Sequence, residues 1–173
     1  MVNLVSVDCD AEDNKSLCAE QGIQGFPTIK SFPGGTAPSR PYDGPREGPA
    51  IVEFATKNMP TFVKRATSPK DAEALKTKAI KKPIALLFTS SATVTPLYKA
   101  LSTEFHKQID FYAARDSKVG QDTLQSFGVD KVPALLLLDG DKVTQYKGAL
   151  KYDALVDFLK PIASKGKGNK DEL

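Results

Sequence analysis

The chain of 173 residues has little of what metal sites and nucleophilic catalysis require, with one histidine, two cysteines and no tryptophan. A structural zinc ion usually takes four Cys or His ligands, and only three are present. We therefore expect no metal site and no cofactor. His106 falls on an expected helix and is interpreted as a surface or packing residue. Ser90 and Ser91 follow an apolar stretch, but no G-x-S-x-G sequence surrounds them, so they are interpreted as loop residues.

Long apolar runs and a strong excess of one charge are also missing. The longest apolar run is PALLLL at residues 133–138, whereas a helix needs roughly 20 apolar residues to span a bilayer. The 24 basic and 21 acidic side chains differ by 3, and no face of an expected element shows clustered Lys and Arg. We therefore expect no membrane span and no nucleic-acid partner. The 40% hydrophobic and 26% charged residues fit a globular chain of one or two small domains.

The two ends of the chain point to different expectations. Lys170, Asp171, Glu172 and Leu173 form a tetrapeptide that a receptor reads as a signal for retention in the endoplasmic reticulum. Small polar residues precede it, so residues 163–173 are predicted to be a flexible tail. This predicts residence in the endoplasmic reticulum lumen, with the retention receptor as a partner. Residues 1–10 lack the pattern of a signal peptide and are predicted to form a strand running into a turn. We therefore expect either that the mature protein was fragmented or that the sequence begins inside a longer precursor.

An internal repeat organises the chain. GIQGFPTIK at residues 22–30 resembles GVDKVPALL at residues 128–136, with an offset of 106 residues. Downstream, Tyr42 and Gly44 nearly meet Tyr146 and Gly148, and an amphipathic helix is expected after each pair. The offset places residue 1 on about residue 107. The first unit, residues 1–58, therefore lacks counterparts of roughly residues 61–106.

The second unit, residues 61–162, contains a full set of elements. Strands are predicted at residues 61–64, 84–88, 109–113, 134–138 and 143–146. Helices are predicted to begin after Ser68 and Thr95, each followed by proline as the first helical residue, and to span residues 121–127 and the segment after Gly148. In the first unit, a strand is predicted at residues 28–32. The order β-α-β-α-β-α-β-β-α predicts an α/β sandwich.

The quoted motifs resemble those of one family. They are VDC at residues 7–9, LCAEQGI at 17–23, GFPTIK at 25–30 and YDGPR at 42–46. The chain resembles the thioredoxin fold and, within it, the protein disulfide isomerase family, most of all the small fungal-type members. This resemblance implies an α/β thioredoxin-like fold with one incomplete unit followed by one complete unit. It implies thiol–disulfide exchange on unfolded or disulfide-containing secretory proteins.

The resemblance also assigns roles to three residues. Pro27 matches the cis-proline that faces the active site, where the backbone of Phe26 would meet an extended substrate. Pro133 matches the same position in the second unit. Arg46 matches an arginine that tunes the active-site thiols, because a nearby cation lowers the pKa of a thiol. The alternatives are an ordinary trans proline and a solvated loop arginine.

The catalytic Cys-Gly-His-Cys motif of the family is absent. In the first unit it would lie before Met1, and residues 88–96 of the second unit contain no cysteine. Leu150 lies near the position that matches Arg46 and cannot tune a thiol. We therefore assign no catalytic residue, expect a redox-silent second unit, and expect the chain to be inactive alone. Whether it is an enzyme stays open. The alternative is a non-enzymatic chaperone or adaptor that binds unfolded clients through the second unit.

Cys9 and Cys18 have the spacing C-x8-C, which differs from the C-x-x-C of thiol–disulfide enzymes. In an oxidising compartment they are predicted to form a structural disulfide. Two free thiols, or a redox-active pair, are the alternatives. Asn14 begins an N-K-S glycosylation sequon between them, although such triplets are common by chance.

Overall fold

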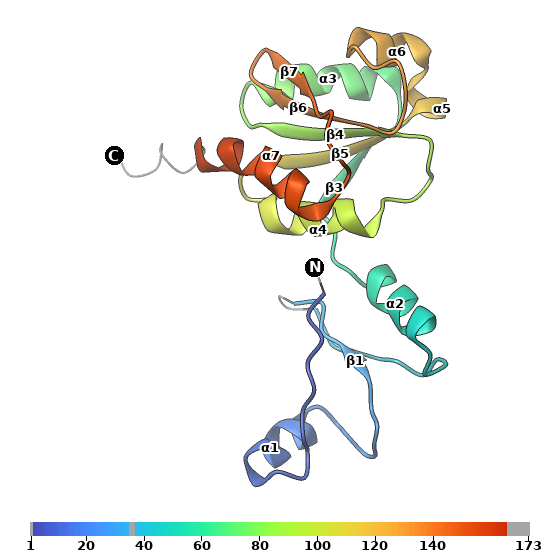
Figure 1. Ribbon diagram of the computed structural model, residues 1–173, viewed down its shortest axis with the longest axis vertical. Helices are drawn as coiled ribbons and strands as arrows, with labels where there is room; N and C mark the ends of the chain where they lie inside the picture. Colours follow the sequence, from blue (N-terminus) through green and yellow to red (C-terminus); the bar gives the residue numbers. More distant parts are fainter. Residues whose placement is uncertain (1, 35–36, 166–173) are drawn as a thin grey trace. The chain divides into compact units, whose positions relative to one another are not determined.

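The computed structural model describes residues 2–34 and 37–165. The chain divides into two compact units, and the boundary along the sequence falls between Met59 and Pro60. Figure 1 shows the elements of both units in sequence colours. Each unit is described by itself below.

The second unit contains a five-stranded mixed sheet in the order β3-β5-β4-β6-β7 (Figure 1). The first three strands in the chain run parallel, and the last two pair antiparallel. The strands are β3 (Val63–Ala66), β4 (Ile84–Thr89), β5 (Asp110–Arg115), β6 (Ala134–Asp139) and β7 (Lys142–Gln145). The predicted α/β thioredoxin-like fold is confirmed, and the first of these strands begins two residues later than predicted.

Helices cover both faces of this sheet and bury it on both sides. One core cluster joins the sheet to α3, α5 and α6, and the other joins it to α4 and α7. The helices are α3 (Pro69–Ala79), α4 (Pro96–Phe105), α5 (Asp116–Val119), α6 (Gln121–Ser126) and α7 (Tyr152–Lys165). Because β6 is buried on both faces, its sequence is the continuous apolar run noted above.

The predicted helix starts are correct in detail. Ser68 Oγ accepts a hydrogen bond from the Asp71 amide, and Thr95 Oγ1 accepts one from the Tyr98 amide. Each capping residue is followed by proline as the first helical residue. The short helix α5 was not predicted. The C-terminal helix continues to Lys165, so the predicted tail is wrong for residues 163–165, and residues 166–173 lie outside the described part of the chain.

The first unit consists of two helices and a two-stranded antiparallel ribbon. Its elements are α1 (Glu12–Glu20), β1 (Lys30–Ser31), β2 (Arg40–Pro41) and α2 (Gly48–Lys57). Among its described residues, Cys18 is the one buried side chain. Helix α2 has Pro49 in its first turn and presents a half-buried apolar stripe that includes Ile51 and Phe54.

The strand predicted within residues 1–10 is wrong, because residues 2–8 form no strand. A strand is stabilised by the neighbours with which it pairs, and none of the described residues pairs with this segment. Leu4 is 98% exposed and Val5 is 76% exposed. The strand predicted at residues 28–32 shortens for the same reason to the two residues of β1, which pair with β2 on one edge alone.

Candidate functional site

The Phe26–Pro27 loop follows directly from the end of α1. Gly22 has a φ of +65°, a left-handed conformation that glycine adopts without steric cost, and the Ile23 amide donates a hydrogen bond to the Cys18 carbonyl at 3.0 Å. The chain then reaches a cis Phe26–Pro27 peptide bond. The Phe26 side chain is 68% exposed and free to contact another molecule.

Arg46 comes to this loop from 19 residues further along the chain, and its Nη2 donates a hydrogen bond of 2.9 Å to the Pro27 carbonyl. A second contact shapes the loop that carries it, because Tyr42 Oη donates to the Pro45 carbonyl at 2.6 Å. The Tyr42 ring lies over Gly44, where an added Cβ would meet it at 2.7 Å. The structure therefore places Phe26, Pro27 and Arg46 together at one edge of the first unit.

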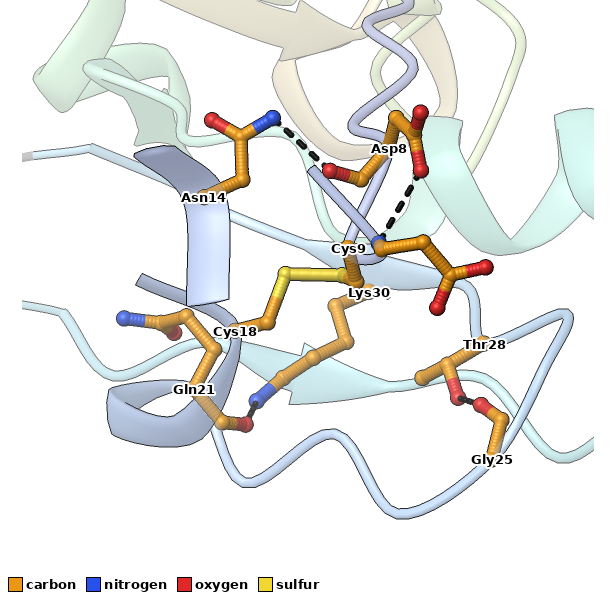
Figure 2. The surroundings of a disulfide bond; sticks show 9 residues. Asp8, Cys9, Asn14, Cys18, Gln21, Gly25, Thr28 and Lys30 are labelled. Carbon is orange, nitrogen blue, oxygen red and sulfur yellow. Dashed lines mark hydrogen bonds between the residues drawn. A yellow bond between two sulfur atoms is a disulfide. The ribbon is translucent and has the colours of Figure 1, made fainter. Parts of the chain in front are cut away.

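Cys9 and Cys18 are joined by a disulfide, with 5.9 Å between their Cα atoms (Figure 2). The bridge fastens the segment before α1 to the helix itself. Neighbouring hydrogen bonds hold the same turn: Asn14 Nδ2 donates to the Asp8 carbonyl at 2.8 Å, and Lys30 Nζ donates to the Gln21 carbonyl at 2.5 Å (Figure 2). No free cysteine exists in the chain, because its two cysteines form this bridge.

Sequence reasoning did not find two of these contacts. Asn14 was singled out as a glycosylation sequon, and in the structure its half-buried amide is engaged with the backbone. Lys30 was noted only as the last residue of the GFPTIK motif, although its ammonium caps the C-terminal end of α1 by donating to the Gln21 carbonyl. A lysine after a G-x-P-T-I motif could have been recognised only through the position of the preceding helix.

The second unit repeats this site without its functional side chains. Val132–Pro133 is also cis, Gly128 has a φ of +69°, and the Val129 amide donates to the Leu124 carbonyl at 2.9 Å. Tyr146 Oη donates to the Ala149 carbonyl at 2.9 Å, as Tyr42 does to Pro45. The residue that follows is Leu150 in place of Arg46, as predicted.

The loop between β4 and α4 in the second unit contains hydroxyl groups and no thiol. The Ser91 amide donates to Thr89 Oγ1 at 3.1 Å, and Ser91 Oγ is paired with Thr93. Behind this loop, the one hydroxyl hydrogen of Tyr98 is shared between the Ala85 and Tyr112 carbonyls, at 2.8 and 3.0 Å from Oη, and burial raises the pKa of Tyr98 well above its usual value. Tyr98 thus fixes α4 to the sheet in its neutral form.

The described ranges contain neither a cluster of metal-ligating side chains nor a membrane-spanning helix. Within residues 2–34 and 37–165, no group of three or more His, Cys, Asp or Glu side chains could hold a metal ion. None of the helices in those ranges is long and apolar enough to cross a membrane. His106, predicted as a packing residue, stacks on Phe62 with ring centroids 3.8 Å apart. The predicted retention signal, Lys170 to Leu173, lies outside the described residues.

Comparison with known proteins agrees with this geometry. The thioredoxin family model matches residues 89–161. A putative protein disulfide-isomerase of Dictyostelium discoideum is 33% identical over 95% of this chain and 41% of its own length. A protein disulfide-isomerase of Aspergillus oryzae is 30% identical over 94% of this chain and 30% of its own.

A solved structure supports the fold alone. The thioredoxin NaTrxh from Nicotiana alata has a TM-score of 0.52 and 22% identity, covering 60% of this chain and 94% of its own. The chain spans less than half the length of the two curated relatives named above. Its two units, the paired proline loops and these relatives lead to one conclusion: the chain belongs to the protein disulfide isomerase family of the thioredoxin superfamily.

Proposed function

We propose that this chain carries the substrate-facing part of a protein that exchanges thiols and disulfides in folding secretory proteins of the endoplasmic reticulum. The relatives named protein disulfide-isomerase support this activity at the level of the family. The observation that carries the proposal to particular residues is the hydrogen bond from Arg46 to the Pro27 carbonyl, beside an exposed Phe26.

The proposed roles follow from elementary chemistry. Phe26 offers an apolar contact to an unfolded client, and the backbone next to it pairs with an extended segment of that client. Arg46 brings a fixed positive charge to the same edge. A cation lowers the pKa of a thiol placed beside it, and a thiolate is the form that attacks a disulfide. The attacking thiol itself is not in this chain, because both cysteines are held in the Cys9–Cys18 bridge.

Insulin reduction in the presence of dithiothreitol tests the absence of catalysis by this chain. We expect the chain to precipitate insulin no faster than its Cys9→Ser/Cys18→Ser variant, because neither has a C-x-x-C pair. Turnover well above that of the variant would show that the bridge itself is redox-active and would contradict the proposal.

Arg46 is tested by a separate experiment with an added thiol. An exposed Cys introduced as Gly25→Cys lies next to Phe26 and Pro27, and its pKa is measured by iodoacetamide alkylation against pH. We expect the pKa to rise when Arg46→Gln is added, because the cation is removed. The same added substitution at Arg40, which is bonded to Asn58 instead, serves as the control. Equal pKa values in the three proteins would contradict the role of Arg46.

One observation favours a second candidate function, that of a non-enzymatic chaperone or adaptor. The second unit is complete, has its own two-sided core and carries no cysteine. Suppression of aggregation of a reduced client protein, measured by light scattering, distinguishes the two. Suppression by a Phe26→Ser/Arg46→Gln variant equal to that of the unaltered chain would favour this second function, because clients would then bind without the proposed contacts of the first unit.

A further inference from the structure

Arg115, the last residue of β5 in the second unit, is half-buried and has no protein partner. Its Nε is buried and reaches no hydrogen-bond acceptor, and its side chain makes no hydrogen bond or ion pair within the described part of the chain. Buried polar groups in folded proteins are nearly always paired, and a guanidinium has five donors to satisfy. The arrangement is therefore suited to an acceptor that another molecule supplies.

The sheet register places two more polar residues on the same face as Arg115. Thr89 pairs directly with Arg115, and Arg65 pairs with Ala113, two residues earlier on the same strand. Residues that pair across strands share a face. Because side chains alternate along a strand, Phe111 lies on the same face of β5 as Arg115, and it packs in the core beneath α4 and α7. Arg115, Thr89 and Arg65 therefore lie at the carboxyl edge of the face that α4 and α7 cover.

Contacts around the loop before α4 leave this edge rich in donors. Arg65 Nη2 donates to the Ala92 carbonyl at 2.7 Å, which holds one guanidinium against the loop. Thr89 Oγ1 accepts a hydrogen bond from the Ser91 amide, so its own hydroxyl hydrogen can be donated elsewhere. The N-terminus of α4 adds a partial positive charge at the end of the same loop. The nearest acidic residue in sequence, Asp116, already accepts a hydrogen bond from the Ser117 amide at 2.6 Å.

On the other side of Thr89 lies the segment that leads into β6. Phe88 pairs with Ala134, which places exposed Pro133 and Lys131 at the other side of β4 from Arg115. A peptide that lies along this edge therefore meets Pro133 first and Arg115 next. In open α/β sheets, ligands bind outside the carboxyl ends of the strands, and residues 90–95 follow the carboxyl end of β4.

We propose that the second unit binds an extended peptide segment carrying Asp or Glu, with the carboxylate on Arg115 and with Arg65 as the second cation. A planar guanidinium pairs with a carboxylate through two parallel hydrogen bonds, which gives the site its selectivity for that group. The proposal does not depend on thiol chemistry, so it stands apart from the redox function proposed above. It gives the chaperone or adaptor alternative a site and a class of client.

Titration of the full chain with two synthetic peptides, followed by amide NMR, tests the proposal. The probes are a ten-residue Ala/Ser peptide with two central Glu residues and the same peptide with Gln in their place. We expect the Glu peptide to bind at least ten times more tightly and to shift the amide signals of Thr89, Ser91 and Arg115. Equal binding of the two peptides would overturn the proposal without any altered protein.

Two variants locate the site. Arg115→Gln is expected to lose at least tenfold in affinity for the Glu peptide, whereas Lys118→Gln, which removes the same charge from an exposed residue nearby, is expected to lose less than twofold. Equal losses of affinity in the two variants would show that binding depends on net charge alone and would overturn the proposed site. Inorganic phosphate is the remaining probe: if it saturates the same amide shifts and the peptide binds no more tightly, the site takes small anions and the peptide proposal is wrong.

Discussion

The two units share their turns and differ in their sheets. Tyr42 and Tyr146 make the same hydrogen bond three residues ahead, and each ring packs on a phenylalanine, at 4.8 Å on Phe54 and at 4.9 Å on Phe158. Their amides also donate to equivalent carbonyls, at 2.9 and 2.8 Å. By the 106-residue offset, however, Val5 corresponds to Phe111, and the first is 76% exposed while the second is 1% exposed.

This difference separates what a chain specifies locally from what it specifies through distant partners. A turn needs a glycine, a proline or a tyrosine within a few residues, and both units have them. A strand also needs at least one neighbouring strand to pair with, and that strand can come from a distant part of the chain. Segment β5 has β3 and β4 beside it, whereas no strand among the described residues pairs with residues 4–8. The same sequence pattern therefore gives a strand in one unit and an extended, exposed segment in the other.

Hydrogen exchange should show the largest contrast between the units. In dilute monomer, we expect the amides of residues 6–8 to exchange almost as fast as in an unfolded chain, because nothing pairs with them. Amides of residues 135–137 should be protected by more than about 1,000-fold, since they open with the whole unit. Similar protection in the two segments would show that residues 1–58 hold a complete sheet, or complete it with a second copy.

The second largest contrast is expected when side chains at equivalent positions of the two units are truncated. Phe111→Ala should lower the free energy of unfolding of the second unit by about 3–5 kcal/mol, because a fully buried ring is replaced by a cavity. Val5→Ala, at the equivalent position of the first unit, should change stability by less than about 0.5 kcal/mol. Urea unfolding followed by NMR signals from each unit measures both values. A loss above about 1 kcal/mol for Val5→Ala would mean that this side chain is buried in solution.

Removal of the bridge should affect the first unit alone. Cys9→Ser/Cys18→Ser is expected to destabilise the turn and helix α1 by about 2–3 kcal/mol, because the unfolded loop between the two cysteines gains freedom. Helical signals of residues 12–20 should weaken in the variant, while those of the second unit stay unchanged. If dithiothreitol or the double substitution left α1 intact, the hydrogen bonds of Asn14 and Lys30 would be sufficient to hold it.

The turn that both units share should respond to substitution in the same way in each unit. Gly44→Ala and Gly148→Ala each place a Cβ against a tyrosine ring, and we expect each to destabilise its own unit by about 1–3 kcal/mol. The matched controls are Gly25→Ala and Gly128→Ala. The first has open space around it, and the second has open space but a positive φ, so only the latter should cost stability through the backbone. Unequal effects of the two tyrosine-facing substitutions would show that the turns differ in rigidity.

The extent of sequence prediction follows the same division. Helix starts at Ser68 and Thr95 and the cis prolines carry their signals within a few neighbouring residues, and the structure has them as expected. The strand near Val5 was predicted from the local sequence alone. Such a pattern shows that a segment is suited to pair as a strand, but it does not show whether a neighbouring strand is present. Arg115 was missed because what distinguishes it is a buried Nε without a hydrogen-bond acceptor. A sequence shows which side chains are donors, but it does not show which acceptors lie near them.

The Cys9–Cys18 bridge has one more consequence, for cleavage of the chain. Lys15 lies on the exposed surface between the two cysteines, where a trypsin-like protease can reach it. A cut after this lysine opens the backbone but leaves both pieces joined by sulfur. The nicked protein therefore keeps its covalent integrity and gains only the mass of one water molecule. It separates into two polypeptides when it meets a reductant, so a single proteolytic event can stay silent until the redox environment changes.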